Sequence, residues 1–215
     1  SDKKQFQITQ KRYFSDANHE LDTASSWFIP LNFATSQNSN FDDVKFTHHF
    51  EADTSEKIIE INDEINWFVF NKQQLGYYRV NYDFENWHSI ITLLNSENYE
   101  QIHVLNRAQL VDDAMSFAES GLIDFNVATG VLMYLKYETE YAPWAAASTY
   151  LNKLNEMFGG RNQNLNVSYI EILFTYNSDI LILRNSFASC RRNCTQNTHL
   201  LKTKFQMSPS LIDLL

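Results

Sequence analysis

The sequence is poor in the residues from which many catalytic sites are built. It contains two cysteines and five glycines among 215 residues. It has no HExxH zinc helix, no GxSxG nucleophile motif and no glycine-rich phosphate loop. We therefore predict no catalytic residue and no metal ligand in this chain, and we expect it to hold no cofactor of its own.

Positive charge and long apolar runs are also scarce. Lys and Arg number 17 against 26 Asp and Glu, giving a net charge of −9, which argues against nucleic acid as a partner. No run of about 18 apolar residues is present, so we predict no transmembrane segment, and the polar N-terminus does not resemble a signal peptide. Because the first methionine is Met115, we expect a processed product or, preferably, a segment of a longer protein.

The two cysteines and two glycosylation triplets bear on the compartment. Cys190 and Cys194 are four residues apart, which would place them on one face of a helix. A disulfide between them is sterically conceivable but would close a very small loop. Asn166 and Asn193 each begin an N-glycosylation sequon. Such triplets also arise by chance, so they shift the expected compartment only slightly towards the extracellular space.

What the sequence does contain is a globular composition, 44% hydrophobic and 14% aromatic, with two different periodicities. Up to residue 83, apolar and polar residues alternate in short runs separated by turns, a pattern typical of strands. We therefore predict that residues 1–83 form a small antiparallel β-sandwich, with Pro30 at an edge or a bulge. The predicted strands are Phe6–Ile8, Trp27–Phe33, Val44–His48, Ile58–Ile61, Trp67–Phe70 and Gly76–Tyr82.

Beyond residue 83, apolar residues recur at helical spacing. Four amphipathic helices with short connections predict an antiparallel array, incomplete in length, over residues 84–215. We expect residues 161–215 to be divergent or poorly ordered. The second helix is predicted from about Asn106 to Ser120, and Pro143 is predicted to be the first residue of the fourth. The other residues expected to begin or end helices are Asp83, Gly121, Asp124 and the pair Gly159-Gly160.

Two pairs of acids and one His–Glu pair are candidates for a site. Asp112-Asp113 lies within the second helix and is expected on a solvated face, since catalysis would require one acid with a raised pKa. Glu138 and Glu140 could instead lock a corner between helices by hydrogen bonds. His49 and Glu51 share a strand face but have no third ligand within sequence reach, so we expect an exposed strand edge rather than a metal site.

Arg79 is the most unusual single charge, because it lies on a strand among tyrosines. We predict a structural role, as an ion pair or a stack over tyrosine, at the joint between the two halves. The alternative is an anchor for a substrate carboxylate. Tyr78, Tyr82 and Asp83 are predicted to complete this interdomain contact, the tyrosines by closing the sandwich and Asp83 by starting the first helix.

Five runs, taken together, resemble a known family. They are ITQKRYF (Ile8–Phe14), WFIPL (Trp27–Leu31), NKQQLGYYRVNYD (Asn71–Asp83), NRAQLVDDAMS (Asn106–Ser116) and ETEYAPW (Glu138–Trp144). In this order they resemble the aminopeptidase N family of zinc metallopeptidases, and its insect midgut members in particular, over roughly residues 5–160. The resemblance implies that residues 1–83 are that family's β-sandwich domain and that residue 84 begins its C-terminal helical domain.

The resemblance also implies a function. The family's HExxH zinc helix and GxMEN motif are not in this sequence, so no catalytic or zinc residue carries over. What is implied is a non-catalytic fragment of a membrane-associated, zinc-dependent aminopeptidase that removes N-terminal residues from peptides. This part would brace the upstream catalytic domain and enclose its cavity, outside the cell or at its surface.

Two alternatives accompany this expectation. The first is a module that binds a protein, a glycan or a bacterial toxin, because insect members of the family serve as docking sites for such toxins. The second is an inactive, degenerate product.

Overall fold

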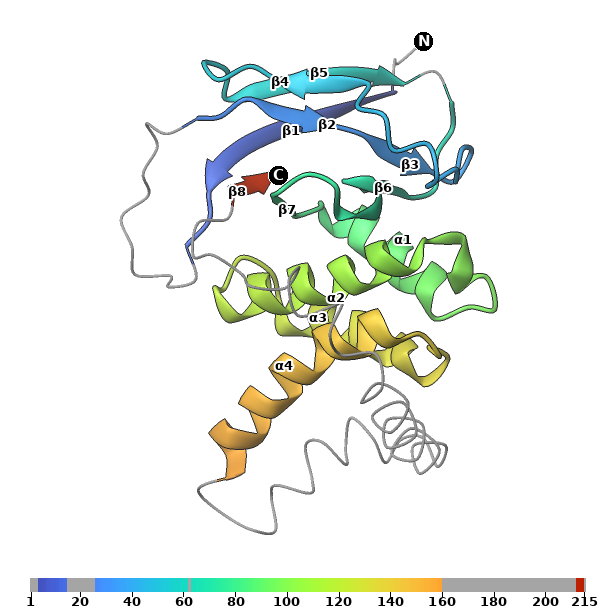
Figure 1. Cartoon of the computed structure of the whole chain (residues 1–215), viewed down its shortest axis with the longest axis vertical. Helices are drawn as coiled ribbons and strands as arrows, with labels where there is room; N and C mark the ends of the chain where they lie inside the picture. Colours follow the sequence, from blue (N-terminus) through green and yellow to red (C-terminus); the bar gives the residue numbers. More distant parts are fainter. Residues whose placement is uncertain (1–3, 15–25, 62, 160–211, 215) are drawn as a thin grey trace, which may run out of the picture.

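The computed structural model describes residues 4–14, 26–61, 63–159 and 212–214. Along these residues strands come first and helices follow, apart from one short strand near the C-terminus (Figure 1). The strands lie together at one end of the molecule, and the helices lie beneath them. The predicted order of β structure followed by α structure is confirmed.

The strands form three small sheets. One has the order β5-β1-β8-β7, and the other two are the pairs β2-β4 and β3-β6. Among the described strands every pairing is antiparallel except that of β7 with β8. The bounds are β1 (Lys4–Arg12), β2 (Ile29–Leu31), β3 (Phe33–Thr35), β4 (His48–Phe50), β5 (Glu56–Ile61), β6 (Phe68–Phe70), β7 (Arg79–Val80) and β8 (Ile212–Leu214).

Alternation along β1 builds the core of the strand half. Phe6 and Ile8 are buried, whereas Gln7 between them is exposed, as the period of two in a strand requires. The ring of Phe6 meets that of Phe70 edge-on, with 5.4 Å between ring centroids, a favourable aromatic geometry. The predicted strand periodicity therefore places β1 correctly.

The chain passes from one sheet to another at Asn32. The predicted strand from Trp27 to Phe33 is two strands, β2 and β3, because the Asn32 side chain between them bonds to other segments. Its Nδ2 donates to the carbonyl of Val44 at 2.7 Å, and its Oδ1 accepts the N–H of Lys72 at 2.7 Å. Pro30 lies on β2, which pairs on one side only among the described strands, so its predicted edge position is confirmed.

The predicted strand Val44–His48 is wrong over most of its length, since β4 begins only at His48. The carbonyl of Val44 accepts a side chain instead of a ladder hydrogen bond. A ladder bond appears only at Thr47, whose N–H donates to the carbonyl of Leu31 at 3.0 Å.

The helices are α1 (Phe84–Leu94), α2 (Val104–Glu119), α3 (Phe125–Leu132) and α4 (Tyr141–Gly159), with short 3-10 turns η1 (Lys72–Gln74), η2 (Tyr99–Gln101) and η3 (Met133–Lys136). Asp83 caps α1 by accepting the N–H of Asn86 at 2.7 Å, and Asp124 caps α3 by accepting that of Asn126 at 2.7 Å. Gly121 follows α2 with φ of 74°, the left-handed conformation that stops a helix. These three predictions are confirmed.

Two predicted helix starts are wrong. Helix α2 begins at Val104, before Asn106, and its N-cap is His103, whose Nδ1 accepts the N–H of Leu105 at 3.3 Å. Helix α4 begins at Tyr141, so Pro143 is its third residue rather than its first. Proline is tolerated there because the first four N–H groups of a helix have no acceptor within the helix.

None of the described helices combines the length and the hydrophobicity that a membrane crossing requires. The pair Cys190 and Cys194 and the sequons at Asn166 and Asn193 lie outside the described residues.

Candidate functional site

Arg79 connects β7 to α2. Its Nη1 donates to Asp113 Oδ1 at 2.8 Å and also to Asp112. The other oxygen of Asp113 accepts the backbone N–H of Val80 at 3.0 Å. The guanidinium lies over the ring of Tyr13, with Cζ 5.6 Å from the ring centroid, a cation–π distance. Two consecutive strand residues are thus bonded to one turn of a helix.

The solvated position predicted for Asp112-Asp113 is wrong. Asp113 is only 3% exposed, and the side chain of Asp112 is 19% exposed. Besides Arg79, Asp112 accepts the hydroxyl of Tyr150 on α4 at 2.8 Å. The pair therefore faces inward, because its ionic and hydrogen-bonding partners come from a strand and from another helix.

The charges of this cluster do not balance, because two carboxylates share one arginine. Burial, reinforced by the charge of Asp112, raises the pKa of Asp113 to about 7 against the opposing charge of Arg79. For Arg79 itself, burial would lower the pKa, but the charges of Asp113 and Asp112 outweigh burial and raise it. The guanidinium therefore stays charged, and the raised pKa brings the titration of Asp113 towards neutral pH.

A second contact of the joint holds the loop Asn71–Gly76. Three of its residues, Asn71, Gln73 and Gln74, have φ of 61°, 54° and 55°, a conformation that costs a non-glycine residue about 1–2 kcal/mol. The Asn106 amide on α2 secures the loop, because Nδ2 donates to the carbonyl of Asn71 at 2.9 Å and Oδ1 accepts the N–H of Gln73 at 2.7 Å. The first turns of α2 thus fix a strained connection between β6 and β7.

The two tyrosines of the joint are buried beside these contacts. The hydroxyl of Tyr82 accepts the N–H of Phe70 at 3.1 Å, and its ring meets Trp87 edge-on with 5.1 Å between centroids. Burial raises the pKa of both Tyr78 and Tyr82. Of the residues predicted for the interdomain contact, Tyr78 directly precedes β7 and Arg79 lies in β7. Tyr82 and Asp83 lie in the connection from β7 to α1.

Glu138 organises the corner that precedes α4. Its carboxylate accepts Arg107 Nε at 2.6 Å and Nη2 at 3.0 Å, and it accepts the hydroxyl of Tyr134 at 3.1 Å. The backbone N–H groups of Thr139 and Glu140 also donate to it. For Glu138 the structure therefore shows the hydrogen-bonded corner rather than an acid open to solvent.

The described residues do not fit a zinc ion. His49 Nε2 lies 2.6 Å from Glu51 Oε1, and both side chains are exposed, so the predicted shared face and exposed edge are confirmed. No cluster of three or more His, Cys, Asp or Glu able to hold a metal occurs in the described part of the chain, whereas a zinc site needs three or four such ligands.

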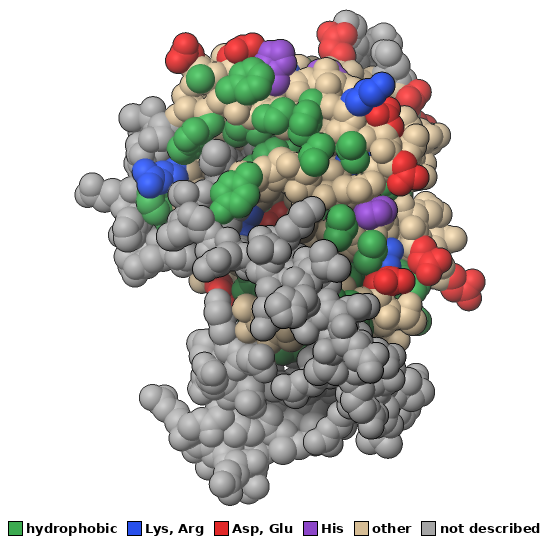
Figure 2. All heavy atoms as spheres, in the orientation of Figure 1, with side chains coloured by type: hydrophobic (Ala, Val, Ile, Leu, Met, Phe, Trp, Pro, Cys, Tyr) green, Lys and Arg blue, Asp and Glu red, His purple; other side chains and the backbone are tan. Residues whose placement is uncertain are grey.

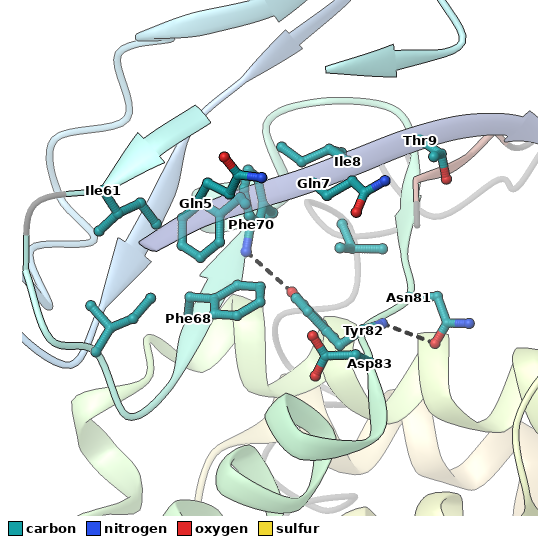
Figure 3. A pocket seen from close by; sticks show the side chains of 13 residues that line it. Gln5, Gln7, Ile8, Thr9, Ile61, Phe68, Phe70, Asn81, Tyr82 and Asp83 are labelled. Carbon is teal, nitrogen blue, oxygen red and sulfur yellow. Dashed lines mark hydrogen bonds between the residues drawn. The ribbon is translucent and has the colours of Figure 1, made fainter. Parts of the chain in front are cut away.

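An apolar groove of about 620 Å³ lies between β1 and the joint. Figure 3 shows β1, from Gln5 to Thr9, along one side of it, with the rings of Phe68, Phe70 and Tyr82 across from the strand. The one charged side chain in its lining is Asp83, which is engaged as the cap of α1. The groove can therefore bind apolar chain but has no acid–base pair with which to catalyse a reaction.

Sequence reasoning missed the partners of Arg79 and Arg107. Asp112 and Asp113 lie in the run NRAQLVDDAMS, some 33 residues after Arg79. Glu138 lies in ETEYAPW, 31 residues after Arg107. The signal that could have found these pairs is the presence of unlike charges in runs that are separate in the sequence.

Comparisons with known proteins agree with the sequence resemblance. The family model described as the ERAP1-like C-terminal domain matches residues 67–175, so the match includes β6, the joint and the helices. The chain is 41% identical over 157 residues to an aminopeptidase N of Plutella xylostella, covering 72% of this chain and 16% of that protein. It is 40% identical over 162 residues to a membrane alanyl aminopeptidase of Heliothis virescens, covering 74% and 16%.

A more distant relative is the thyrotropin-releasing hormone-degrading ectoenzyme of Rattus norvegicus, 31% identical over 166 residues, with 74% of this chain and 15% of that protein covered. The chain thus spans about a sixth of the length of these relatives.

Proposed function

Because the chain belongs to the aminopeptidase N family, we propose that it is a non-catalytic part of a zinc-dependent aminopeptidase. In this proposal residues 1–83 are a β-sandwich domain, and residues 84–215 begin a C-terminal domain of antiparallel helices. Because the family model matches through residue 175, the divergence predicted for residues 161–215 is kept only for residues 176–215. Zinc and the peptides whose N-terminal residues are removed belong to the intact enzyme. This part braces the upstream catalytic domain and encloses its cavity.

The observation that carries the proposal is that the charged side chains at the joint are bonded to one another. Arg79, Asp112 and Asp113 bond to one another and to buried neighbours, and Glu138 is bonded to Arg107 in the same way. None of these groups lines the groove beside them. Charged groups whose partners join a strand to a helix, or one helix to the next, support a bracing role, because a catalytic acid or anchor must reach its substrate.

We also propose that the parent enzyme acts outside the cell or at its surface. This rests on relatives whose names describe a membrane aminopeptidase and an ectoenzyme. The upstream catalytic domain of the same polypeptide would then be the principal partner of this chain.

The bracing role is tested in the full-length enzyme by Arg79→Ala. Calorimetry is expected to show earlier unfolding of this part, while kcat at 25 °C is retained by the molecules that remain folded. The control is Lys45→Ala, which removes an exposed positive charge from the connection between β3 and β4. Loss of kcat with an unchanged melting profile would assign Arg79 to the chemistry and contradict the proposal.

A second candidate function is a surface that binds a protein or glycan. Figure 2 shows apolar side chains gathered over the strand half of the visible face, and three aromatic residues are strongly exposed: Phe28 at 60%, Tyr77 at 59% and Phe84 at 72%. Aromatic residues are enriched at the centres of binding surfaces. Capture of a purified toxin or glycan by the chain, weakened by Phe28→Ala or Phe84→Ala, would favour this candidate over bracing.

A further inference from the structure

Helix α2 begins with an unusual cap. Helices are most often capped by Ser, Thr, Asp or Asn, whose side-chain oxygen accepts a backbone N–H of the first turn. Here the cap is His103, whose ring nitrogen Nδ1 accepts the N–H of Leu105 at 3.3 Å. The carbonyl of His103 accepts the N–H groups of Asn106 and Arg107, each at 2.9 Å. One residue thus provides the acceptors for three N–H groups at the start of the helix.

This cap requires one protonation state of the imidazole. A neutral ring with its proton on Nε2 leaves Nδ1 free to accept a hydrogen bond, whereas an imidazolium carries a proton on both nitrogens. Protonated His103 would therefore direct an N–H group at the N–H of Leu105. It would also place a positive charge at the N-terminus of α2, where the helix dipole disfavours positive charge. Protonation of this one ring thus removes the cap.

The groups that act on the imidazole come from two elements. In the connection between β3 and β4, the ring of Phe41 stacks on that of His103, with 6.4 Å between ring centroids and 28° between ring planes. Burial lowers the pKa of His103; the charge of Asp42 in the same connection opposes this, and the charge of Arg107 on α2 adds to it. The neutral ring that the cap requires is therefore favoured in the folded chain.

The other charged residues of the adjoining turns have partners of their own. On η1, Lys72 donates to a backbone carbonyl at 3.1 Å. On η2, Glu100 interacts with the tyrosine before it. Before α4, Glu138 is bonded to Arg107 at 2.6 and 3.0 Å. Among the residues that the structure describes, the charges that act on the imidazole are those of Asp42 and Arg107.

The turn that His103 caps also holds the strained loop of the joint. Asn106 lies in this turn and is fully buried. Its side chain bonds to the carbonyl of Asn71 and to the N–H of Gln73, and both of these loop residues have left-handed backbone conformations. The loop therefore depends on the position of the first turn of α2, and its backbone can relax when that turn frays.

We propose that His103 is a pH-sensitive cap of the joint: the neutral imidazole keeps Asn106 against the loop Asn71–Gly76, and protonation frays the first turn of α2 and frees the loop with it. Histidine in the unfolded chain has a pKa near 6.5, and that of His103 in the folded chain is lower. The unfolded state thus binds more protons as pH falls through about 6.5, and this group's contribution to the free energy of unfolding decreases towards acid pH. The cap is complete in neutral and alkaline solution.

The test is hydrogen exchange in the full 215-residue chain at about pH 7.5 and about pH 5, which bracket the titration of histidine. Protection factors, which are corrected for the intrinsic effect of pH, are compared at Leu105 and Gln73. Both are expected to fall about fivefold or more in acid, the effect of losing one helix cap. The internal control is the amide of Asn126, which the carboxylate of Asp124 holds at the start of α3, and it should change by less than about twofold.

Two variants isolate the imidazole. His103→Asn keeps a side-chain acceptor that does not titrate, so protection at Gln73 should change by less than about twofold between the two pH values. His88→Asn, which removes an exposed histidine from α1, should keep the wild-type response. Asp113 titrates in the same range but is present in every protein compared. Equal responses of the wild type and His103→Asn would overturn the proposal.

Nitrogen NMR of the wild type provides a second measurement that needs no substitution. The ¹⁵N shifts of a histidine ring distinguish a protonated nitrogen from one that accepts a hydrogen bond. The proposal predicts that in neutral solution His103 carries its proton on Nε2 and leaves Nδ1 unprotonated. A proton on Nδ1 in neutral solution would overturn the proposal, because that tautomer cannot accept the N–H of Leu105.

Discussion

Arg79 and Asp113 are joined by a bond of 2.8 Å between Nη1 and Oδ1, while the other oxygen of Asp113 accepts the backbone N–H of Val80 at 3.0 Å. One helix carboxylate thus holds both a strand side chain and the strand backbone beside it. Because Asp113 is nearly inaccessible to solvent, removal of one partner leaves its carboxylate with a desolvation cost that its remaining bonds do not offset.

The first prediction concerns Arg79 in the isolated chain. Arg79→Ala leaves two carboxylates in the joint without a counter-charge, and breaking a buried pair in this way costs about 3–5 kcal/mol. The free energy of unfolding, measured by urea denaturation, should fall by that amount. Lys45→Ala, at an exposed position, should change it by about 0.5 kcal/mol or less. Equal, cooperative unfolding curves for the wild type and Arg79→Ala would show that the bond does not hold the two halves together.

A double substitution tests whether Arg79 and Asp113 are energetically coupled. If the cost of Arg79→Ala arises from stranded carboxylates, Asp113→Asn should recover part of it, since the amide removes one buried negative charge. The loss in the double variant should then be smaller than the sum of the two single losses. Strict additivity would contradict the coupling.

The second prediction concerns pH. A carboxyl group in the unfolded chain loses its proton near pH 4, whereas Asp113 in the folded chain has a pKa of about 7. The folded state therefore binds more protons between these values, and this group's contribution to the free energy of unfolding decreases as pH rises from about 4 to about 7. Urea denaturation across this range should give a less negative or more positive slope for Asp113→Asn than for the wild type; identical slopes would contradict the assignment.

The joint also shows where sequence reasoning succeeds and where it stops. Asp83, Gly121 and Asp124 were predictable because a cap depends on residues within one turn of itself. The buried position of Asp113 was not predictable, because an acid in the middle of a helix is usually solvated. Its partner Arg79 also lies 34 residues away in the sequence. The local pattern of α2 contains no signal that a strand will cover this face.

The errors in element boundaries have the same origin. Asn106, where α2 was predicted to start, lies in the first turn of the helix, and its side chain holds the loop at Asn71 and Gln73. The predicted strand from Trp27 to Phe33 divides at Asn32 because the amide there bonds to segments distant in sequence. Period-two alternation describes a strand but not the point at which it changes sheets.

The third prediction concerns the corner at Glu138. Glu138→Ala removes the acceptor of five hydrogen bonds and strands the Arg107 guanidinium, so the free energy of unfolding should fall by about 3–5 kcal/mol. Glu138→Gln keeps the shape of the side chain, so the free energy of unfolding should fall by less than in Glu138→Ala. The control is Glu140→Gln, an exposed side chain beside it, with an effect of about 0.5 kcal/mol or less. Equal losses for Glu138→Ala and Glu140→Gln would show that the corner is not held by this carboxylate.

The fourth prediction concerns alkaline pH. Burial raises the pKa of Tyr78, Tyr82 and Tyr134 above the ordinary value for tyrosine. Their unfolded forms ionise near pH 10, so the folded state binds more protons above that pH and its stability falls as pH rises further. Tyrosinate absorbance should therefore rise in two phases, the second coincident with loss of the circular dichroism signal. A single phase completed before unfolding would contradict the burial of these rings.

The central claim is that the chemistry of the enzyme lies outside this chain, and hydrolysis of an alanyl chromogenic substrate by the purified chain in the presence of zinc tests it most directly. The account predicts no turnover above the zinc-only control, and no stoichiometric zinc in the protein after gel filtration. Turnover that co-elutes with the chain through successive columns and is abolished by a chelator would contradict it.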